Sequence, residues 1–420
     1  MFQSLLNAWK LPDLRKKLLF TAAMIALYRL GCYLPVPGID VKAVAGAFGN
    51  GGALDFYDLF TGGALRQMAI FAMGIMPYIT ASIIMQLLTM VSPRLEALMK
   101  EGPAGQKKVN QYTRYFTAAL AFIEAGGFVF LFKSMGAFPV NAAGQSTFTG
   151  INVWLVILTL MVGATMVMWL GELVTQRGIG NGISLMIYAS IVSRLPSGLW
   201  KLLNMNPGYW VLMAIVSLLV IAAIIFVTQG QRRIPVQYAK RVVGRKVYGG
   251  QSTYLPLRVN MAGVIPVIFA SSVLLFPVTI AKMGPWGGMQ WIARVLGPSS
   301  WWYLAAEVLL IIAFTYFYTA VQFNPIDQAD NLKKYGGFVP GIRPGRPTAA
   351  YLDRVLTRIT LPGSLFLAAI VLLPTALIKG VGVSFYFGGT SLLIVVGVAL
   401  DTMQQMESQL LMRHYEGFLK

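Results

Sequence analysis

The sequence predicts an all-α integral membrane protein with ten transmembrane helices in two pseudo-symmetric inverted halves. The chain has 420 residues, of which 56% are hydrophobic and 12% are charged, whereas a soluble domain has about 25% charged residues. Apolar runs of about 20 residues, each long enough to cross a bilayer, recur along the whole length. Because backbone polar groups in hydrocarbon need partners within their own segment, these runs are expected to be helices.

Ten apolar runs qualify as predicted spans, and the fifth of them is the shortest. They cover residues 18–34, 68–91, 115–132, 151–174, 183–195, 209–227, 259–280, 302–323, 359–378 and 384–406. A loop rich in proline and glycine, residues 196–208, separates the first five from the last five. Five spans in each half give the halves opposite orientations, as in inverted repeats. The count therefore predicts two domains, 1–195 and 196–420.

The distribution of basic residues predicts that both termini are cytosolic. The chain carries 34 Lys and Arg against 15 Asp and Glu. If the N-terminus lies inside and the spans alternate, most basic residues fall in cytosolic segments, as the positive-inside rule requires. Two cytosolic loops, 229–258 and 323–358, are unusually long. Short β-branched and aromatic runs around a glycine turn predict a hairpin in the first loop, and the second is expected to become helical after Thr348.

Several chemistries are excluded by the residue types that the chain lacks. It has one cysteine, Cys32, so no intramolecular disulfide is possible. Its one histidine, His414, lies in the tail, which excludes Ser–His hydrolysis within the membrane and a Cys/His zinc site. The glycine-rich stretch 177–184 lacks the lysine of a phosphate-binding loop, and Asn181 is expected to cap a helix there. We therefore expect no enzymatic activity, no cofactor and no metal.

Ionisable residues inside the predicted spans are functional candidates by default. They are Arg29, Glu124, Glu172, Glu307 and Asp401. Most lie near span ends, where snorkelling or helix capping explains them, and Glu124 is the one that lies centrally. A secondary transporter of small solutes, which is the alternative function, would normally show more polar groups at mid-depth.

A short polar segment directly precedes the second predicted span. Residues 58–67 are interrupted by glycine and are too short to cross a bilayer. On composition alone, an amphipathic helix on the outer surface explains this segment as well as a helix that folds back to membrane depth.

Five motifs resemble the SecY family, whose members form the central subunit of the bacterial protein-translocation channel. They are GIMPYITASIIMQLL (74–88), RGIGNGIS (177–184), NMAGVIPVIFASS (260–272), DNLKKYGGFVPGIRPG (330–345) and FYFGGTSLLIVV (385–396). The motifs occur in the family's order, and the similarity covers essentially the whole chain. The resemblance implies an hourglass pore between the two halves that opens laterally to lipid.

The resemblance implies a ring of isoleucines at the narrowest point of the pore. Its members would be Ile75, Ile79, Ile183, Ile187, Ile268 and Ile394. An apolar constriction resists wetting and blocks ions, although an isoleucine in such a helix more commonly packs against lipid or another helix.

The resemblance also implies a plug, at about residues 55–67, which folds back into the outer funnel. Asp58 and Arg66 belong to it, and Gly62 and Gly63 are expected to provide the mobility with which it leaves the funnel.

A lateral gate is implied between the second and third spans and the seventh and eighth. Its polar residues are Thr80, Gln86, Glu124, Asn260, Ser271 and Ser272. Some of them are expected to hydrogen-bond across the closed gate, each for about 0.6–2 kcal/mol. A hydrophobic signal helix could then open the gate by offering apolar surface to lipid. The alternative is that these residues join helices without a gating role.

The cytosolic loops are expected to dock partners through basic residues. These are Arg241, Arg245, Lys246, Arg343 and Arg346; the positive-inside rule alone also explains basic residues there. The resemblance implies a channel in the bacterial plasma membrane that translocates unfolded secretory polypeptides and releases transmembrane segments laterally. A SecA-like ATPase or the ribosome would drive it. SecE-like and SecG-like subunits, preproteins with signal sequences and anionic lipids are the other expected partners.

Overall fold

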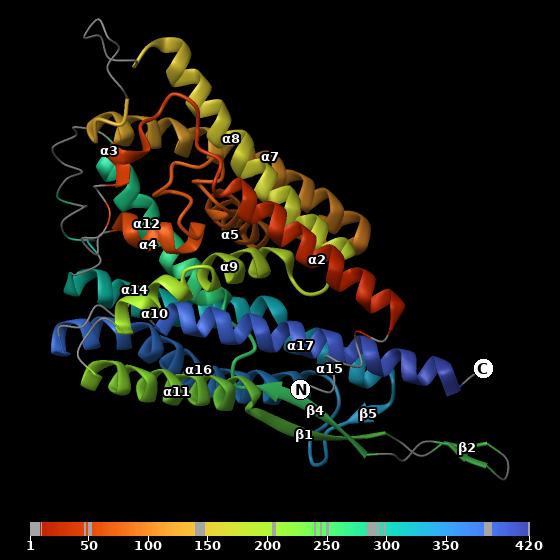
Figure 1. Ribbon diagram of the computed structural model, residues 1–420. Coiled ribbons are helices and arrows are strands. Elements are labelled where there is room, and N and C mark those ends of the chain that lie inside the picture. Colours follow the sequence, from red (N-terminus) through yellow and green to blue (C-terminus); the bar gives the residue numbers. More distant parts are fainter. Residues whose placement is uncertain are drawn as a thin grey trace, which may run out of the picture. The chain divides into compact units, whose positions relative to one another are not determined.

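The computed structural model is helical, as the sequence predicts, with short strands in one region (Figure 1). It describes residues 9, 11–45, 48, 53–138, 148–203, 207–238, 241–243, 246–248, 252–283, 291, 295, 297, 300–381 and 389–418. The chain divides into two compact units. The first contains Met1–Asn206, Ser271–Leu304 and Val398–Lys420, and the second contains Pro207–Ala270 and Ala305–Gly397. The predicted division between residues 195 and 196 stays a prediction.

The first unit is a bundle of helices that position residues 55–67, the predicted plug. Its helices before Asn206 are α2 (Pro12–Gly31), α3 (Val41–Ala45), α4 (Ala53–Thr61), α5 (Met76–Val91), α6 (Pro93–Lys100), α7 (Pro103–Ser134), α8 (Gly150–Arg177), α9 (Gly182–Val192) and α10 (Leu195–Leu203). Helix α7 packs between α5 and α8, and α9 packs against α8, α2 and the short α4. Three further helices each contribute residues to both units: α12 (Ile265–Met283), α14 (Trp301–Gln322) and α17 (Gly389–Phe418).

Five helical segments are long and apolar enough to cross a membrane, counted over the described residues. They are Pro103–Lys133, Gly150–Arg177, Val211–Gln229, Trp301–Lys334 and Arg346–Pro374. Helices α5 and α6 form a sixth candidate, bent by 97° at the break between them. The other predicted spans coincide at least in part with helices α2, α9, α12 and α17, which do not meet this criterion over their described residues. The count of ten spans therefore remains a prediction.

The second predicted span begins later than expected, and the start at residue 68 is wrong. Helix α5 begins at Met76, and the chain from residue 62 to 75 consists mainly of turns. Positive φ angles at Met68 (48°) and Gly74 (56°) interrupt any helix there. The freed backbone groups bond instead to the segment after α2, because Val36 N donates to the Met68 carbonyl (2.7 Å) and Ile70 N donates to the Leu34 carbonyl (2.8 Å).

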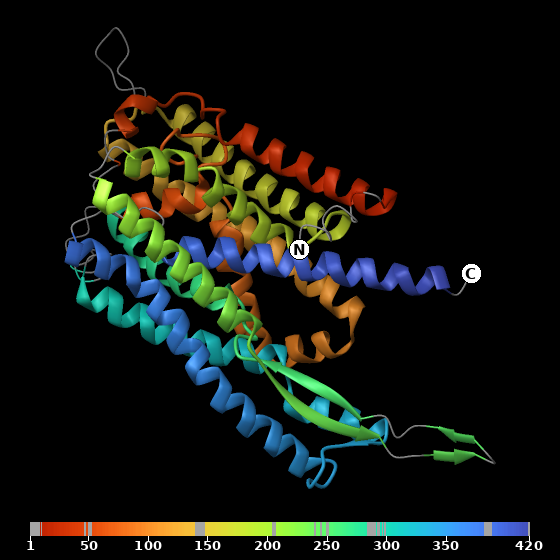
Figure 2. The same cartoon turned by 60° about the horizontal axis from the view of Figure 1, so that its bottom comes forward.

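The second unit contains the predicted hairpin. Strand β1 (Gln231–Tyr238) pairs antiparallel with β4 (Ser252–Arg258) and β5 (Gly337–Phe338) pairs with the other edge of β1, so the sheet order is β4-β1-β5. Strands β2 (Arg241–Val243) and β3 (Lys246–Tyr248) pair with each other. Figure 2 shows the long β1–β4 ribbon emerging beyond α11 (Pro207–Gln229). The prediction of a hairpin in the first long loop is confirmed.

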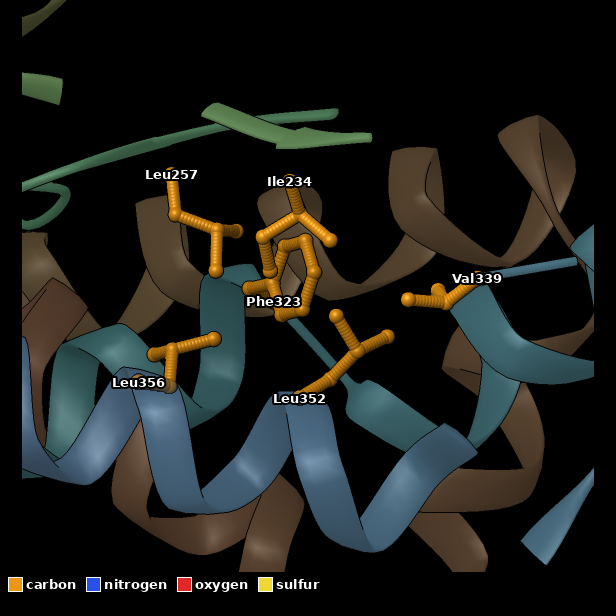
Figure 3. Close-up of a cluster of buried hydrophobic side chains, with 6 residues drawn as sticks. All are labelled: Ile234, Leu257, Phe323, Val339, Leu352 and Leu356. Carbon is orange, nitrogen blue, oxygen red and sulfur yellow. The ribbon is translucent and has the colours of Figure 1, made fainter. Parts of the chain in front are cut away.

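The second long loop folds onto this hairpin and forms a small hydrophobic core. Its elements are α15 (Pro325–Lys334), β5 and the start of α16 (Arg346–Val381). The buried side chains are Ile234, Leu257, Phe323, Val339, Leu352 and Leu356, and Figure 3 shows them pointing toward one another from strand, turn and helix. Alternating burial along β1 explains the hairpin side of this core, since every second strand residue faces the same side.

Asparagine caps begin two of the helices. One of these caps, at α9, was predicted, and the other marks α15, for which no helix was predicted. The Asn181 side chain accepts from Ile183 N (3.1 Å) and Ser184 N (3.4 Å) at the start of α9, as expected. The same geometry recurs at α15, which the sequence analysis did not predict: Asn324 accepts from Ile326 N (3.0 Å), and Pro325 follows it. An Asn-Pro pair is a helix-start signal. Helix α10 likewise occupies part of the predicted loop 196–208.

Candidate functional site

The predicted plug contains most of α4, a helix that is too short to cross a bilayer and that packs within the first unit. Helix α4 has nine residues and packs against α9 (Figure 1). The Tyr57 hydroxyl donates to the Met73 carbonyl (3.0 Å), and the Tyr57 ring meets the Phe128 ring of α7 edge-on at 5.4 Å between centroids. A Cβ placed on Gly74 would lie 3.0 Å from the Thr61 side chain. Helix α4 therefore touches the backbone immediately before Ile75.

Asp58 is the charged centre of this seat. Its side chain is 1% exposed and forms an ion pair with Arg194, which follows the C-terminal end of α9. It also accepts from the Arg66 backbone N–H (3.0 Å) and the Thr61 hydroxyl (3.4 Å). Burial raises the pKa of the Asp58 carboxyl above its usual range, and Arg194 and the donated hydrogen bonds only partly offset that effect. The Arg66 side chain itself is exposed, so Arg66 acts here through its backbone.

Gly62 and Gly63 form a tightly packed turn in the structure. Both have positive φ, 66° and 92°, a conformation that strains other residues. A Cβ on Gly62 would lie 2.5 Å from Arg29 Nη1 and 2.9 Å from Ser190 Cα, so no side chain fits there without a shift. The two glycines thus allow close packing of this turn against Arg29 and Ser190. The expectation that they also provide mobility remains a prediction.

Four of the six predicted ring residues belong to the first unit. Ile75 and Ile79 lie at the start of α5, and Ile183 and Ile187 lie in the first two turns of α9. All are buried except Ile183, which is partly exposed. A Cβ on Gly171 of α8 would lie 3.4 Å from Ile183 Cγ1 and 3.6 Å from Ile75 Cδ1. The structure therefore brings one isoleucine of each helix against the same glycine.

The remaining two ring residues belong to the second unit. Ile268 lies in α12 and Ile394 lies in α17, and their exposures are 6% and 0%. Helix α17 closely approaches the start of α12, because a Cβ on Gly397 would lie 2.3 Å from Val264 Cγ2. The four residues of the first unit and the two of the second are thus described separately, and the assembly of all six into one ring remains a prediction.

The predicted gate residues are buried or partly buried, but the predicted hydrogen bonds across the gate remain untested. Thr80 bonds within its own helix, to the Met76 carbonyl (3.2 Å), and Asn260 Nδ2 donates to the Gly263 carbonyl (3.0 Å). Among the described residues, Gln86 Oε1 and Asn260 Oδ1 are buried acceptors with no donor. Glu124 is 9% exposed, and Ser271 and Ser272 are 1% and 3% exposed.

Of the predicted docking residues, two have described side chains, and they lie next to the small core, just before α16 and at its first residue. Arg343 and Arg346 are exposed. The Thr348 hydroxyl donates to the Arg343 carbonyl (2.9 Å), and Ile342 N donates to the Val339 carbonyl (3.0 Å). Arg241 and Lys246 lie in β2 and β3, and their side chains are outside the described part of the structure, as is the whole of Arg245.

Two residues that contact the predicted plug, Arg29 of α2 and Arg194 beyond α9, are not among its predicted residues. Arg29 Nη1 donates to the Gly62 carbonyl (3.1 Å), and a buried hydrogen bond between the Tyr28 and Ser190 hydroxyls (2.7 Å) joins α2 to α9 beside it. The sequence signal for Arg29 is that it is a charged residue inside a predicted span. Nothing in the sequence indicated that Arg194 faces Asp58, because 136 residues separate them.

Known proteins resemble this chain in sequence and in fold. The SecY family model matches residues 69–403. The chain is 51% identical to the protein translocase subunit SecY of Streptomyces galbus, and the match covers 100% of both chains. The fold resembles "The structure of a protein conducting channel", with a TM-score of 0.67 at 21% identity over 94% of this chain and 92% of that one. It also resembles "Sec61 in the Canine ribosome-channel complex from the endoplasmic reticulum", with a TM-score of 0.62 at 19% identity and the same coverage of both chains.

The structural matches show a shared helical fold, and the full-length SecY relatives together with the long apolar helices define the class as a multi-pass membrane protein. The chain belongs to the SecY family of protein translocase subunits. The resemblance seen in the sequence motifs is thereby confirmed.

Proposed function

We propose that the chain is the protein-conducting subunit of a translocase in a bacterial plasma membrane. It carries unfolded secretory polypeptides across the membrane and releases transmembrane segments laterally into lipid. It supplies the path and not the energy, which comes from a SecA-like ATPase or from the ribosome. The family's translocase subunits support this function, and the Sec61 relative solved on a ribosome supports that partner.

One structural observation carries the proposal: a non-spanning helix is seated beside two of the candidate ring helices. Helix α4 packs on α9 and touches the backbone just before Ile75, while Ile75 and Ile183 share contact with Gly171. Short polar helices at membrane depth are tolerated where they face a protein-walled cavity. A plug that can move out of the pore and a collar formed by the six predicted isoleucines would together keep the path closed when no polypeptide occupies it.

In the proposed architecture, ten spans form two inverted halves of five around an hourglass pore, with both termini in the cytosol. The six isoleucines form the collar, and the helices that carry Gln86, Glu124 and Asn260 border the lateral gate. Gln86 Oε1 and Asn260 Oδ1 are buried acceptors without a donor among the described residues. Such atoms would be expected at a gate whose hydrogen bonds change when it opens.

The proposed partners meet the chain on different faces. The exposed Arg343 and Arg346 lie on a turn braced by the small core, so they suit carboxylates of an ATPase or phosphates of ribosomal RNA. Membrane subunits resembling SecE and SecG complete the complex, and anionic lipids meet the cytosolic basic residues. Preproteins with signal sequences are the substrates.

The test is capture of a stalled secretory chain by a photo-crosslinker placed at Ile187. The matched control is the same probe at Ile123 of α7, an isoleucine that is 63% exposed on the helix surface, whereas Ile187 is 1% exposed. We expect capture from Ile187 and not from Ile123. Equal capture from both positions, or capture from neither, would refute a path lined by the isoleucine collar.

The alternative of a small-solute transporter is disfavoured by the family assignment. It would predict saturable uptake of a small solute that depends on Glu124. Absence of uptake together with capture of a polypeptide at Ile187 separates the two functions.

A further inference from the structure

Two arginines, one in α2 and one in the turn after α9, converge on the turn that ends the plug helix. Arg29, in the last turn of α2, donates from Nη1 to the Gly62 carbonyl (3.1 Å) and from Nη2 to the Tyr33 hydroxyl (3.2 Å). Arg194, two residues beyond α9, pairs with the Asp58 carboxylate. A Cβ on Gly62 would meet Arg29 first, and a Cβ on Gly63 would meet Arg194 first. The turn is thus bracketed by two guanidinium groups.

The charges on this turn explain why two cations gather there. The C-terminal end of a helix carries partial negative charge on its unpaired carbonyls, which cations stabilise. Arg29 meets such a carbonyl, and its position is itself held by the Tyr33 ring, whose centre lies 5.4 Å from the guanidinium carbon. Asp58 adds a full negative charge that is almost completely buried when α4 is seated. Since a buried charge that loses its partner is costly, the seated plug needs Arg194.

We propose that Arg29 and Arg194, together called the arginine clasp, are positioning residues that hold the plug helix seated and set how readily it is released. The inference rests on the proposed function, since it concerns the regulation of the same plug. Release frees Asp58 to be hydrated and leaves both guanidinium groups without their plug partners. The clasp therefore adds an electrostatic cost to the first step of opening, and removing either arginine lowers that cost.

Backbone hydrogen exchange of the plug measures this step directly, without any need for transport. In the seated plug, Gly63 N donates to the Asp58 carbonyl (3.1 Å), and Arg66 N donates to Asp58 Oδ1 (3.0 Å). These amides exchange when the turn opens, so their rates report the fraction of opened plug. The full chain in lipid nanodiscs is compared with Arg29→Gln and Arg194→Gln. Loss of a hydrogen bond to a charged group is expected to raise plug exchange by about tenfold, while amides in the middle of α8 stay unchanged.

Two further variants separate the clasp from a general loss of charge or of stability. Arg66→Gln removes the same charge from the same segment, but the Arg66 side chain is exposed, so plug exchange should stay at the wild-type rate. The double variant Asp58→Asn with Arg194→Gln removes the buried charge together with its partner, so it should return exchange close to the wild-type rate.

Wild-type exchange in Arg194→Gln, or a rise in Arg66→Gln equal to that in Arg194→Gln, would overturn the clasp. Failure of the double variant to restore protection would also overturn it. The channel itself is tested by capture at Ile187. If substrate is captured at Ile187 but the arginine variants leave plug exchange unchanged, the clasp alone is refuted. If the arginine variants change plug exchange as expected but no substrate is captured at Ile187, the proposed function alone is refuted.

Discussion

A methyl group added at Gly182 should separate α9 from α8 and displace the two candidate ring residues on α9. Gly182 is the first residue of α9, directly before Ile183. An ideal Cβ there would lie 1.9 Å from the Gly171 carbonyl oxygen and 2.8 Å from Val174 Cβ, both on α8. The nearest obstacle is backbone, which cannot rotate away as a flexible side chain can.

The expected cost follows from this overlap. Forcing an extra methyl group into a packed interface costs about 1–3 kcal/mol, and the better helix propensity of alanine recovers only part of it. Gly126 of α7 is the matched control, because a Cβ there would meet nothing within 4 Å. Since glycine within a helix is less stable than alanine by about 0.5–1 kcal/mol, Gly126→Ala should slightly stabilise the protein. The two substitutions therefore act in opposite directions.

Thermal unfolding of the purified protein measures both variants, and resting ion conductance in a planar bilayer measures the position of the collar. Gly182→Ala should lower the unfolding midpoint and raise conductance, and Gly126→Ala should do neither. Equal unfolding midpoints for the two variants would show that the α8–α9 contact yields without cost. The inference that this contact positions Ile183 and Ile187 would then be wrong.

Three other predictions concern the small core, the collar and the plug. Leu352→Ala should destabilise the core beneath the hairpin by about 2–5 kcal/mol, seen as faster proteolysis within α15 and β5, and unchanged cleavage would contradict the packing in Figure 3. Replacing the four collar isoleucines of the first unit by glycine should raise the resting ion conductance. An unchanged conductance would contradict the idea that the collar blocks ions. Because burial raises the pKa of the Asp58 carboxyl in the seated plug, the seated state binds a proton more readily than the released one. Lowering the external pH from 7 toward the ordinary carboxyl range near about 4 should therefore favour seating and lower conductance, and Asp58→Asn should abolish this dependence.

A fifth prediction concerns docking. Arg343→Glu should impair export driven by the partner ATPase or ribosome without changing the unfolding midpoint, because its exposed side chain makes no contact in the core and its carbonyl keeps the bond from Thr348. Normal export in this variant would remove Arg343 from the docking surface.

Much of the fold follows from the sequence because the bilayer imposes simple rules. Long apolar runs must become helices, and they do so from Pro103 to Lys133 and from Gly150 to Arg177. Local chemistry is equally readable: Asn181 caps α9 as predicted, and alternating residues after Gln231 form the expected hairpin. The helices, the Asn181 cap and the hairpin depend on residues that lie close together in the chain, so their spacing can be read from the sequence.

Tertiary structure decided where the second span begins and what holds the plug. The residues from 68 to 75 are apolar enough to continue a helix, but pairing with the segment at 34–36 offers their backbone groups other partners, so α5 starts at Met76. The pairing of Asp58 with Arg194 joins residues 136 positions apart, and no periodicity encodes such a contact. The sequence indicates that a buried charge such as Asp58 needs a partner. The packing of α4 against α9 determines that this partner is Arg194.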